Sequence, residues 1–373
     1  MANIQALGEL INWVDVRNKG VISDNLLGIN IDKFFMPSVA NIIGTDLSSY
    51  KLIRKKQFAC NPMHVGRDEK MPIALYMDDS PSIVSPAYFV FEIKDAAKVN
   101  PEYLMLWFRR AEFDRECWYH TDGSVRGGIT WDEILEMTVP VPSIEEQNEL
   151  VKSYRDIERR IQIKKEINDN LVATAKASLL KLFIENDNIP KQQIGHFCFE
   201  VKAGGTPNRT MHSYWNNGLY PWVKNGEVKN NIIIDTEEFI SQSGYENSSA
   251  KLVKKHSVLM AMYCVSTPQL AYTDIDVTTN QAVCAMTTRN KLQAAYLYYY
   301  LMFFGQDLIN DANGSAQINL SKELISNYCI PIPDDAMLSN MNLIENLEYR
   351  TQVSKEIVAL TSLSQLLIAN LSR

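Results

Sequence analysis

Two long stretches of the chain place apolar side chains at three- and four-residue steps, the spacing that gives a helix one apolar face. The first starts at Ser143, where Glu146 can complete a capping box, and continues to about Glu185 without glycine or proline. The second starts at Asp334 and continues towards Arg373. The apolar positions are Leu150, Tyr154, Ile157, Ile161, Leu171, Ala175 and Leu182 in the first helix, and Leu343, Leu347, Val353, Ile357, Leu360, Leu367 and Leu371 in the second.

Each predicted helix is longer than a small domain needs for its own core, since the first would extend about 60 Å at ~1.5 Å per residue. We expect the two helices to pack on each other as an antiparallel coiled coil. The alternative is that each folds back on its own domain. Lys164, Asn168 and Ser178 interrupt the first apolar face, and a polar residue in such a seam tends to set register and partner at some cost in stability.

The segment that precedes each helix occurs twice. Residues 123–142 read GSVRGGITWDEILEMTVPVP and residues 314–333 read GSAQINLSKELISNYCIPIP, without a gap and displaced by 191 positions (314 minus 123). Earlier landmarks drift in offset, as insertions in surface loops would produce: Lys51 to Lys55 resembles Lys251 to Lys255, and Tyr103 resembles Tyr296. We therefore predict two similar globular domains, at residues 1–143 and 187–333, with long helices at 144–186 and 334–373.

The composition is that of a globular protein, with 46% hydrophobic residues and no apolar run long enough for a membrane span. The first residues lack the features of a signal peptide, and the six cysteines are scattered, so we expect a cytoplasmic protein with reduced thiols. A net charge of −7 is opposite to that of a self-sufficient DNA binder. A nucleic-acid site would therefore have to be local, and Lys and Arg do cluster at 54–56 and 251–255.

No motif in the sequence predicts catalysis. The chain has no glycine-rich phosphate loop, no G-x-G-x-x-G and no Asn/Asp-Pro-Pro-aromatic motif of amino-methyltransferases. Ser178 and Lys181 match S-x-x-K by chance, because they lie within a long helix. His196, Cys198 and His212 lack the close partners of a metal site. We predict no catalytic residue and no metal ligand.

Short motifs occur in the same order as in one known family. In the first domain they are Leu27-Gly28-Ile29-Asn30, Pro37-Ser38-Val39-Ala40-Asn41, Gly44-Thr45-Asp46-Leu47, Phe58-Ala59-Cys60-Asn61-Pro62-Met63, Val65-Gly66-Arg67-Asp68, Ser85-Pro86-Ala87-Tyr88, Asp122-Gly123-Ser124, Pro140-Val141-Pro142 and Glu145-Glu146-Gln147. In the second they are Gly204-Gly205-Thr206-Pro207, Tyr214-Trp215, Pro221-Trp222-Val223-Lys224 and Thr279-Asn280-Gln281-Ala282-Val283. With the repeat, these motifs make the whole chain resemble the specificity (S) subunit of type I restriction-modification systems.

The resemblance implies an α/β (α+β) fold with two target-recognition domains, separated by an antiparallel coiled coil with pseudo-two-fold symmetry. It implies a non-catalytic subunit whose domains each read one half of a bipartite, asymmetric target in double-stranded DNA, while the helices set the spacer. The expected partners are two adenine methyltransferase (M) subunits, which use S-adenosylmethionine, and the restriction/translocase (R) subunits. This chain itself would bind no cofactor. Glu145, Glu146 and Gln147 are expected at a partner contact, and the second copy departs there with Asp334-Asp335-Ala336.

Residues that suit DNA lie in the expected loops, because Arg, Lys, Asn and Gln read base edges while Ser, Thr and Lys suit phosphates. The candidates are Lys55, Lys56, Asn61, His64, Arg67, Ser124 and Arg126 in the first domain, and Thr206, Asn208, Arg209, Tyr214, Lys224, Asn225, Ser315 and Gln317 in the second. Arg126 and Gln317 occupy equivalent repeat positions. For Trp215 and Trp222 we expect core packing instead of base stacking.

Two other readings stay open. One is a structural adaptor whose domains recognise proteins and whose coiled coil is a spacer; it predicts that no methyltransferase subunit co-purifies. The other is an enzyme with an active site that the sequence does not reveal, which requires a pocket of perturbed titratable groups. A fused restriction-methylation enzyme is disfavoured, because the two repeats occupy the 373 residues.

Overall fold

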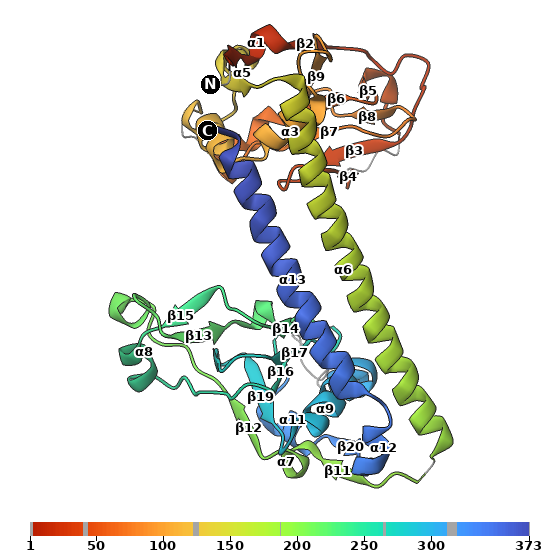
Figure 1. Ribbon diagram of the computed structural model, residues 1–373, viewed down its shortest axis with the longest axis vertical. Helices are drawn as coiled ribbons and strands as arrows, with labels where there is room; N and C mark the ends of the chain where they lie inside the picture. The colour runs from red at the N-terminus through yellow and green to blue at the C-terminus, as the bar shows by residue number, and fades with distance from the viewer. Residues whose placement is uncertain are drawn as a thin grey trace. The chain divides into compact units, whose positions relative to one another are not determined.

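The computed structural model describes residues 3–39, 44–121, 127–186, 188–263, 266–311 and 319–372. The chain has a mixed α/β architecture and forms two compact units, Met1–Arg160 with Leu360–Arg373, and Ile161–Ala359. Figure 1 shows the two long helices, α6 (Ile144–Glu185) and α13 (Leu343–Ala369). Each of them contributes residues to both units. No helix of the described ranges is long and apolar enough to cross a membrane.

The first unit contains two four-stranded sheets, the two-stranded β1–β10 pair and a group of short helices. Its strands are β1 (Asn3–Ala6), β2 (Ile11–Val14), β3 (Leu26–Ile29), β4 (Phe35–Pro37), β5 (Lys51–Ile53), β6 (Gln57–Cys60), β7 (Ile73–Leu75), β8 (Ser82–Val84), β9 (Phe89–Ile93) and β10 (Thr138–Val141). Its short helices are α1 (Leu7–Leu10), η1 (Leu47–Ser49), η2 (Pro62–His64), α2 (Val65–Asp68), α3 (Pro101–Phe108), α4 (Ala111–Tyr119) and α5 (Trp131–Glu136).

Strand order in the first unit is β2-β9-β6-β7 in one sheet and β4-β3-β8-β5 in the other. The main core lies between the first sheet and helix α3. The Phe58 and Phe91 rings stack there at 5.0 Å between centroids, and the Phe108 ring of α3 meets the Phe58 ring edge-on at 5.7 Å. These buried aromatic rings fix the helix on the sheet, since large apolar side chains contribute most to core stability.

The second unit has a five-stranded main sheet and a longer central helix. Its strands are β11 (Lys191–Gln193), β12 (Glu200–Ala203), β13 (Tyr220–Val223), β14 (Asn231–Ile233), β15 (Glu238–Ile240), β16 (Val258–Ala261), β17 (Leu270–Thr273), β18 (Thr278–Thr279), β19 (Val283–Thr287) and β20 (Cys329–Pro331). Its other helices are α7 (Ile194–Phe197), η3 (His212–Tyr214), η4 (Asn225–Glu227), α8 (Gln242–Glu246), α9 (Lys291–Phe304), α10 (Gln306–Asp311), α11 (Lys322–Asn327) and α12 (Asp335–Ser339). The last short helix, η5 (Asn370–Ser372), belongs to the first unit.

Strand order in the second unit is β12-β19-β16-β17-β14 in the main sheet and β15-β13-β18 in a smaller one. Helix α9 carries the run Tyr296 to Leu301, of which Tyr296, Leu297, Tyr298 and Tyr299 are fully buried. A helix that is apolar or aromatic on most sides needs cover on most sides. The sheet, α6 and α13 provide it, since residues of all three belong to the same core cluster.

The repeat in the sequence corresponds to a repeated frame. Strand β1 pairs antiparallel with β10, and β11 pairs antiparallel with β20, so each Pro-x-Pro segment closes on the start of its own domain. The Tyr103 hydroxyl donates to the Pro140 carbonyl at 2.7 Å, and the Tyr296 hydroxyl donates to the Pro331 carbonyl at 2.5 Å. The predicted duplication is therefore confirmed at the level of this frame.

Helix α6 begins as the sequence predicts. The Glu146 backbone N–H donates to the Ser143 hydroxyl oxygen, and the Ser143 backbone N–H donates to the Glu146 carboxylate. These reciprocal bonds satisfy N–H groups that a helix start leaves unpaired. The predicted capping box is confirmed, and α6 then continues unbroken to Glu185.

The second long helix differs from the prediction of one helix starting at Asp334. Asp334 does cap a helix, because its carboxylate accepts from the Met337 N–H at 2.8 Å, but that helix is α12 and it ends at Ser339. Asn342 has a left-handed φ of 51°, which interrupts the helical backbone before α13 starts at Leu343. Asparagine is one of the few residues that adopt this conformation at low cost, and the segment contains no glycine or proline that would have marked it.

The long helices pair antiparallel within each unit. In the second unit Asn346 contacts Leu171, Arg350 contacts Asn168, and Lys164 pairs with Glu356 at 2.5 Å. In the first unit the Ser364 hydroxyl donates to the Glu158 carboxylate at 3.1 Å. The partner number on α6 falls as the number on α13 rises, so the predicted antiparallel pairing is confirmed. The alternative, in which each long helix folds back on its own domain, also holds in part, because Leu343 and Leu347 pack in the core of the domain that precedes them.

Candidate nucleic-acid interface

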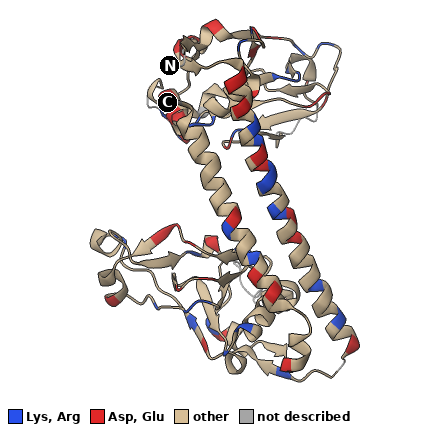
Figure 2. Ribbon diagram, in the orientation of Figure 1, with Lys and Arg blue, Asp and Glu red and all other residues tan. Residues whose placement is uncertain are grey.

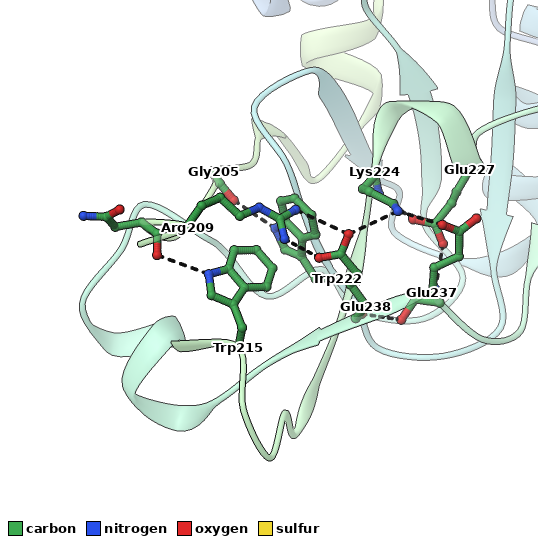
Figure 3. A network of polar contacts seen from close by, with 10 residues as sticks. Gly205, Arg209, Trp215, Trp222, Lys224, Glu227, Glu237 and Glu238 are labelled. Carbon is green, nitrogen blue, oxygen red and sulfur yellow. Dashed lines mark hydrogen bonds and ion pairs between the residues drawn. The ribbon is translucent and has the colours of Figure 1, made fainter. Parts of the chain in front are cut away.

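Among the candidate cations, Arg209 is held in place by two aromatic rings and a carboxylate (Figure 3). Its guanidinium carbon lies 3.7 Å from the ring centroid of Trp215 and 4.8 Å from that of Trp222. Its two terminal nitrogens, Nη1 and Nη2, donate to the two carboxylate oxygens of Glu238. A guanidinium held over aromatic faces and bonded in pairs keeps one orientation, while half of the Arg209 side chain stays exposed.

Lys224 joins the same network. Its ammonium lies 2.6 Å from Glu237 and 3.1 Å from Glu238, and the Lys224 backbone N–H donates to Glu227 at 2.7 Å. The hydrogen bond to Glu237 and the one to Glu238 raise the pKa of Lys224. The hydrogen bond from Arg209 lowers the pKa of Glu238. Both pKa shifts favour the charged forms, so Lys224 and Glu238 form an ion pair near neutral pH.

The backbone brings these groups together through one strand pair and one close approach. Trp222 and Glu238 are cross-strand partners in the antiparallel β13–β15 pair. The Trp222 indole N–H donates to the Gly205 carbonyl at 3.0 Å, and a Cβ at Gly205 would lie 2.0 Å from the Ser249 hydroxyl oxygen. Glycine at 205 lets the segment that carries Arg209 approach the sheet. Trp222 is 2% exposed, which confirms that it is a packing residue.

The other candidates of the second domain have local bonds. The Thr206 hydroxyl donates to the Gln281 side chain, and the Asn208 side chain accepts from the Thr210 N–H at 3.0 Å. Tyr214 is half-buried in η3, and its carbonyl accepts from the Ser241 N–H at 2.8 Å. The Asn225 amide donates to the Tyr263 carbonyl at 3.1 Å and accepts from the Met262 N–H. Asn225 therefore holds η4 against the segment at Met262 and Tyr263. The positive charge among these candidates comes from Arg209 and Lys224.

In the first domain the candidates lie on two loops. Lys55 and Lys56 form the turn between β5 and β6, with Lys56 at a left-handed φ of 69°, and the Lys55 ammonium lies 2.6 Å from the exposed Asp79. Asn61 caps η2 by accepting from the Met63 N–H, and Arg67 donates from two nitrogens to Asp68 at 2.6 and 2.8 Å. Nothing is described of the His64 side chain. The turn and the 61–67 segment hold their cations on exposed positions.

Four candidates lie outside the described residues, namely Ser124, Arg126, Ser315 and Gln317. The residues that follow them are described and contact residues that neighbour the other candidates. The Gly66 N–H donates to the Gly127 carbonyl at 2.9 Å, beside Arg67. In the second domain Asn319 forms a bridge with Tyr263, whose carbonyl accepts from Asn225. Each repeat segment therefore leads into the loop that carries the neighbouring candidates.

The expected partner residues have different environments. Glu145 is exposed, and Glu146 completes the helix cap with Ser143. Gln147 is 0% exposed, and its amide bonds to the Asn100 N–H at 2.8 Å, the Lys98 carbonyl at 3.0 Å and the Pro142 carbonyl at 2.9 Å. A direct partner contact by Gln147 is therefore wrong, because the whole amide is used inside its own domain.

The carboxylates that contact the candidate cations of the second domain, Glu237 and Glu238, were not predicted from the sequence. Glu237 and Glu238 orient Lys224 and Arg209, and Gln281 orients Thr206, but none of these three is among the candidate residues predicted from the sequence. No local motif marks Glu238, because it lies 29 positions from Arg209 and is placed opposite Trp222 by the register of β13 and β15. Exposed ion pairs of this kind contribute little to stability, so their effect is mainly on orientation.

Comparisons with known proteins agree with the resemblance to type I specificity subunits. Residues 193–337 match the family described as type I restriction modification DNA specificity domain. The type I restriction enzyme EcoR124I/EcoR124II specificity subunit of Escherichia coli is 22% identical over 137 residues, or 35% of this chain and 34% of that protein. The aligned part thus spans about a third of that relative's length. The predicted resemblance to type I specificity subunits is confirmed.

One solved structure shares the fold. The S subunit of a type I restriction-modification system from M. genitalium superposes with a TM-score of 0.59 at 13% identity, covering 100% of this chain and 96% of that one. The HsdS subunit from Thermoanaerobacter tengcongensis has a TM-score of 0.39 at 16% identity, covering 99% and 96%. The first likeness supports the α/β architecture with two long helices.

Proposed function

We propose that this chain, whose residues 193–337 belong to the type I restriction modification DNA specificity domain family, is the DNA-recognition subunit of a type I restriction-modification complex. Each domain reads one half of a bipartite, asymmetric target, and the long helices set the number of unread base pairs between the halves. The observation that carries the proposal is the position of Arg209 and Lys224, an oriented pair of cations within the segment that matches the family.

The chemistry of Arg209 suits recognition of a base edge or a phosphate. Glu238 accepts from Nη1 and Nη2, which leaves the other N–H donors of the fork available. A planar fork bonds in pairs to guanine O6 and N7 or to phosphate oxygens. Because the two indoles and Glu238 already fix the orientation, less side-chain entropy is lost when the fork binds DNA.

The same proposal assigns partner docking to the long helices. From Ile357 to Ser372 the chain contains no charged residue, whereas α6 carries charges along its length (Figure 2). Leu363 and Leu366 on α13 are 50% and 60% exposed. Exposed leucines on an uncharged helix surface are typical of a protein interface. We assign this surface to a methyltransferase subunit, and a second such subunit and the restriction/translocase subunits would join through the complex.

In this proposal the chain is not an enzyme. Methyl transfer and its S-adenosylmethionine would belong to the methyltransferase subunits, and DNA cleavage to the restriction subunits. The acidic balance of −7 fits such a role, because the partner subunits would hold much of the DNA backbone.

The test is to sequence methyladenine in DNA from cells that express the chain with its methyltransferase subunit. The expected result is one split, asymmetric motif that disappears when the chain is omitted. A methylation pattern that ignores the chain would overturn the proposal. Purification of the chain from its native cells without any methyltransferase subunit would favour the adaptor reading.

A further inference from the structure

Arg350 of α13 is a buried cation whose partners are neutral. Its side chain is 2% exposed. Nε donates to the Asn168 side-chain oxygen at 3.1 Å, Nη1 to the Tyr298 and Tyr299 hydroxyls at 3.4 Å, and Nη2 to the Asn230 carbonyl at 3.4 Å. The tyrosine rings add cation–π contacts at 5.6 and 5.7 Å. Among the described residues Arg350 thus joins α6, α9 and the loop before β14 through oxygen atoms that carry no full charge.

Asn346 lies one helical turn earlier on the same face of α13 and extends the network. Its amide nitrogen donates to the Leu171 carbonyl of α6 at 2.8 Å, and its oxygen accepts from the Tyr299 hydroxyl. Tyr299 therefore accepts from Arg350 and donates to Asn346. We call Asn168, Tyr298, Tyr299, Asn346 and Arg350 the Arg350 cluster. It makes two separate contacts between α13 and α6, both within the second unit.

Burying the Arg350 cluster costs free energy, and that cost depends on the register of the helices that carry its members. A buried cation without a carboxylate is tolerated only while its hydrogen-bond partners stay in place. Apolar residues along a helix seam can exchange neighbours when one helix slides by a turn, but a slide of about 5.4 Å along α6 would separate Arg350 from Asn168 and Asn346 from the Leu171 carbonyl. Polar groups in helix seams are known to select register for this reason.

We propose that the Arg350 cluster determines target spacing, by fixing the position of α9 and α13 along α6. This inference rests on the proposed function, in which the continuous helix α6 sets the distance between the two half-sites. Ile161, Ala175 and Leu179 provide an apolar seam on α6 without directional bonds. The cluster selects one register from those that this seam permits. A displacement by one helical turn corresponds to roughly one to two base pairs of B-DNA, which rises about 3.4 Å per base pair.

The test variant is Asn168→Leu with Arg350→Leu, which replaces the cation and its side-chain partner on α6 by apolar groups, while the Tyr298 and Tyr299 hydroxyls keep their bonds to the Asn231 carbonyl and to Asn346. Replacement of a buried polar group together with its partner is often neutral for stability, so the chain is expected to fold. Methyladenine sequencing should then find a second motif whose spacer differs by about one to two base pairs, at 10% or more of the methylated sites. The unmodified complex should show one spacer only.

Register can be measured without DNA. Spin labels attached through a keto amino acid at the exposed positions 166 on α6 and 352 on α13 lie within one unit. The unmodified chain should give one distance, and the double variant should give a second distance or a shift of about 5 Å. Asn346→Leu removes one contact to α6 and keeps Arg350, and should change the distances in the same direction if the double variant does not fold.

The matched control is Lys164→Ala with Glu356→Ala, an ion pair between the same helices that is partly exposed. It should keep one distance and one spacer. A double variant with one unchanged distance overturns the proposal, and so does a second distance with an unchanged spacer. If the unmodified complex methylates nothing, the proposed function fails, while the distance measurement still decides whether the cluster sets register.

Discussion

At the scale of single residues, Arg209 shows how a weak surface interaction can have a strong effect on orientation. Its ion pair with Glu238 is half exposed and contributes little to folding. The pair nevertheless holds a planar donor against the rings of Trp215 and Trp222. Lysine cannot reproduce this, because an ammonium is a point charge without the flat, paired donor geometry of guanidinium.

Arg209→Lys is therefore expected to weaken binding of the complex to its cognate duplex by about 10- to 100-fold, or ~1–3 kcal/mol. Thermal stability should change little. Fluorescence anisotropy with a labelled duplex at fixed salt measures the effect. Lys181→Ala is the control, since Lys181 is another exposed cation paired with a carboxylate, at 3.8 Å from Glu185. Equal affinity for Arg209→Lys and the unmodified complex would remove Arg209 from the interface.

Gln147 illustrates the opposite case, a buried residue with a structural role. It joins the start of α6 to Asn100, whose side chain caps α3 by accepting from the Glu102 N–H. Gln147→Ala would leave the Asn100 N–H and two carbonyls without this partner. We expect a loss of about 2–3 kcal/mol of stability, measured as a lower thermal midpoint. Glu145→Ala, two positions earlier and exposed, should keep the midpoint, and a stable Gln147→Ala would contradict this account.

At the scale of elements, the sequence was most informative where local rules decide. The Ser143 and Glu146 capping pair predicted the start of α6, and the apolar stripe predicted its length. The break at Asn342 was not predictable, because it depends on one left-handed asparagine and not on glycine or proline. The Glu238 partner of Arg209 was hidden for another reason. The two residues are 29 positions apart, and they meet through the register of β13 with β15 and the bond between Trp222 and the Gly205 carbonyl.

The surface of α13 gives a prediction about assembly. Leu363→Glu with Leu366→Glu should abolish co-purification with the methyltransferase subunit, because two carboxylates would have to be desolvated at the interface. The fold should persist, since both leucines are at least half exposed. Gln365→Glu is the matched control, as it adds a charge between the two leucines without replacing an apolar group. Retention of the subunit by the double variant would place docking elsewhere.

At the scale of the whole molecule, the negative net charge implies that base recognition and most of the affinity for DNA come from different subunits. The cations of the candidate interface are few and most have a carboxylate within ion-pair distance. With a net charge of −7, the chain as a whole repels DNA at long range. Base selectivity can reside in this chain, but most phosphate neutralisation would have to come from its partners.

The chain alone should therefore bind its cognate duplex at least about 100-fold more weakly than the complex at the same salt concentration. The affinity of the complex should also fall more steeply with salt, because each neutralised phosphate adds about 0.9 to the slope of log K against log salt. Titrations of the duplex at several salt concentrations, with and without the methyltransferase subunits, measure both quantities. Equal affinities and equal slopes would mean that this chain neutralises the phosphates by itself, through cations that local carboxylates release when DNA arrives.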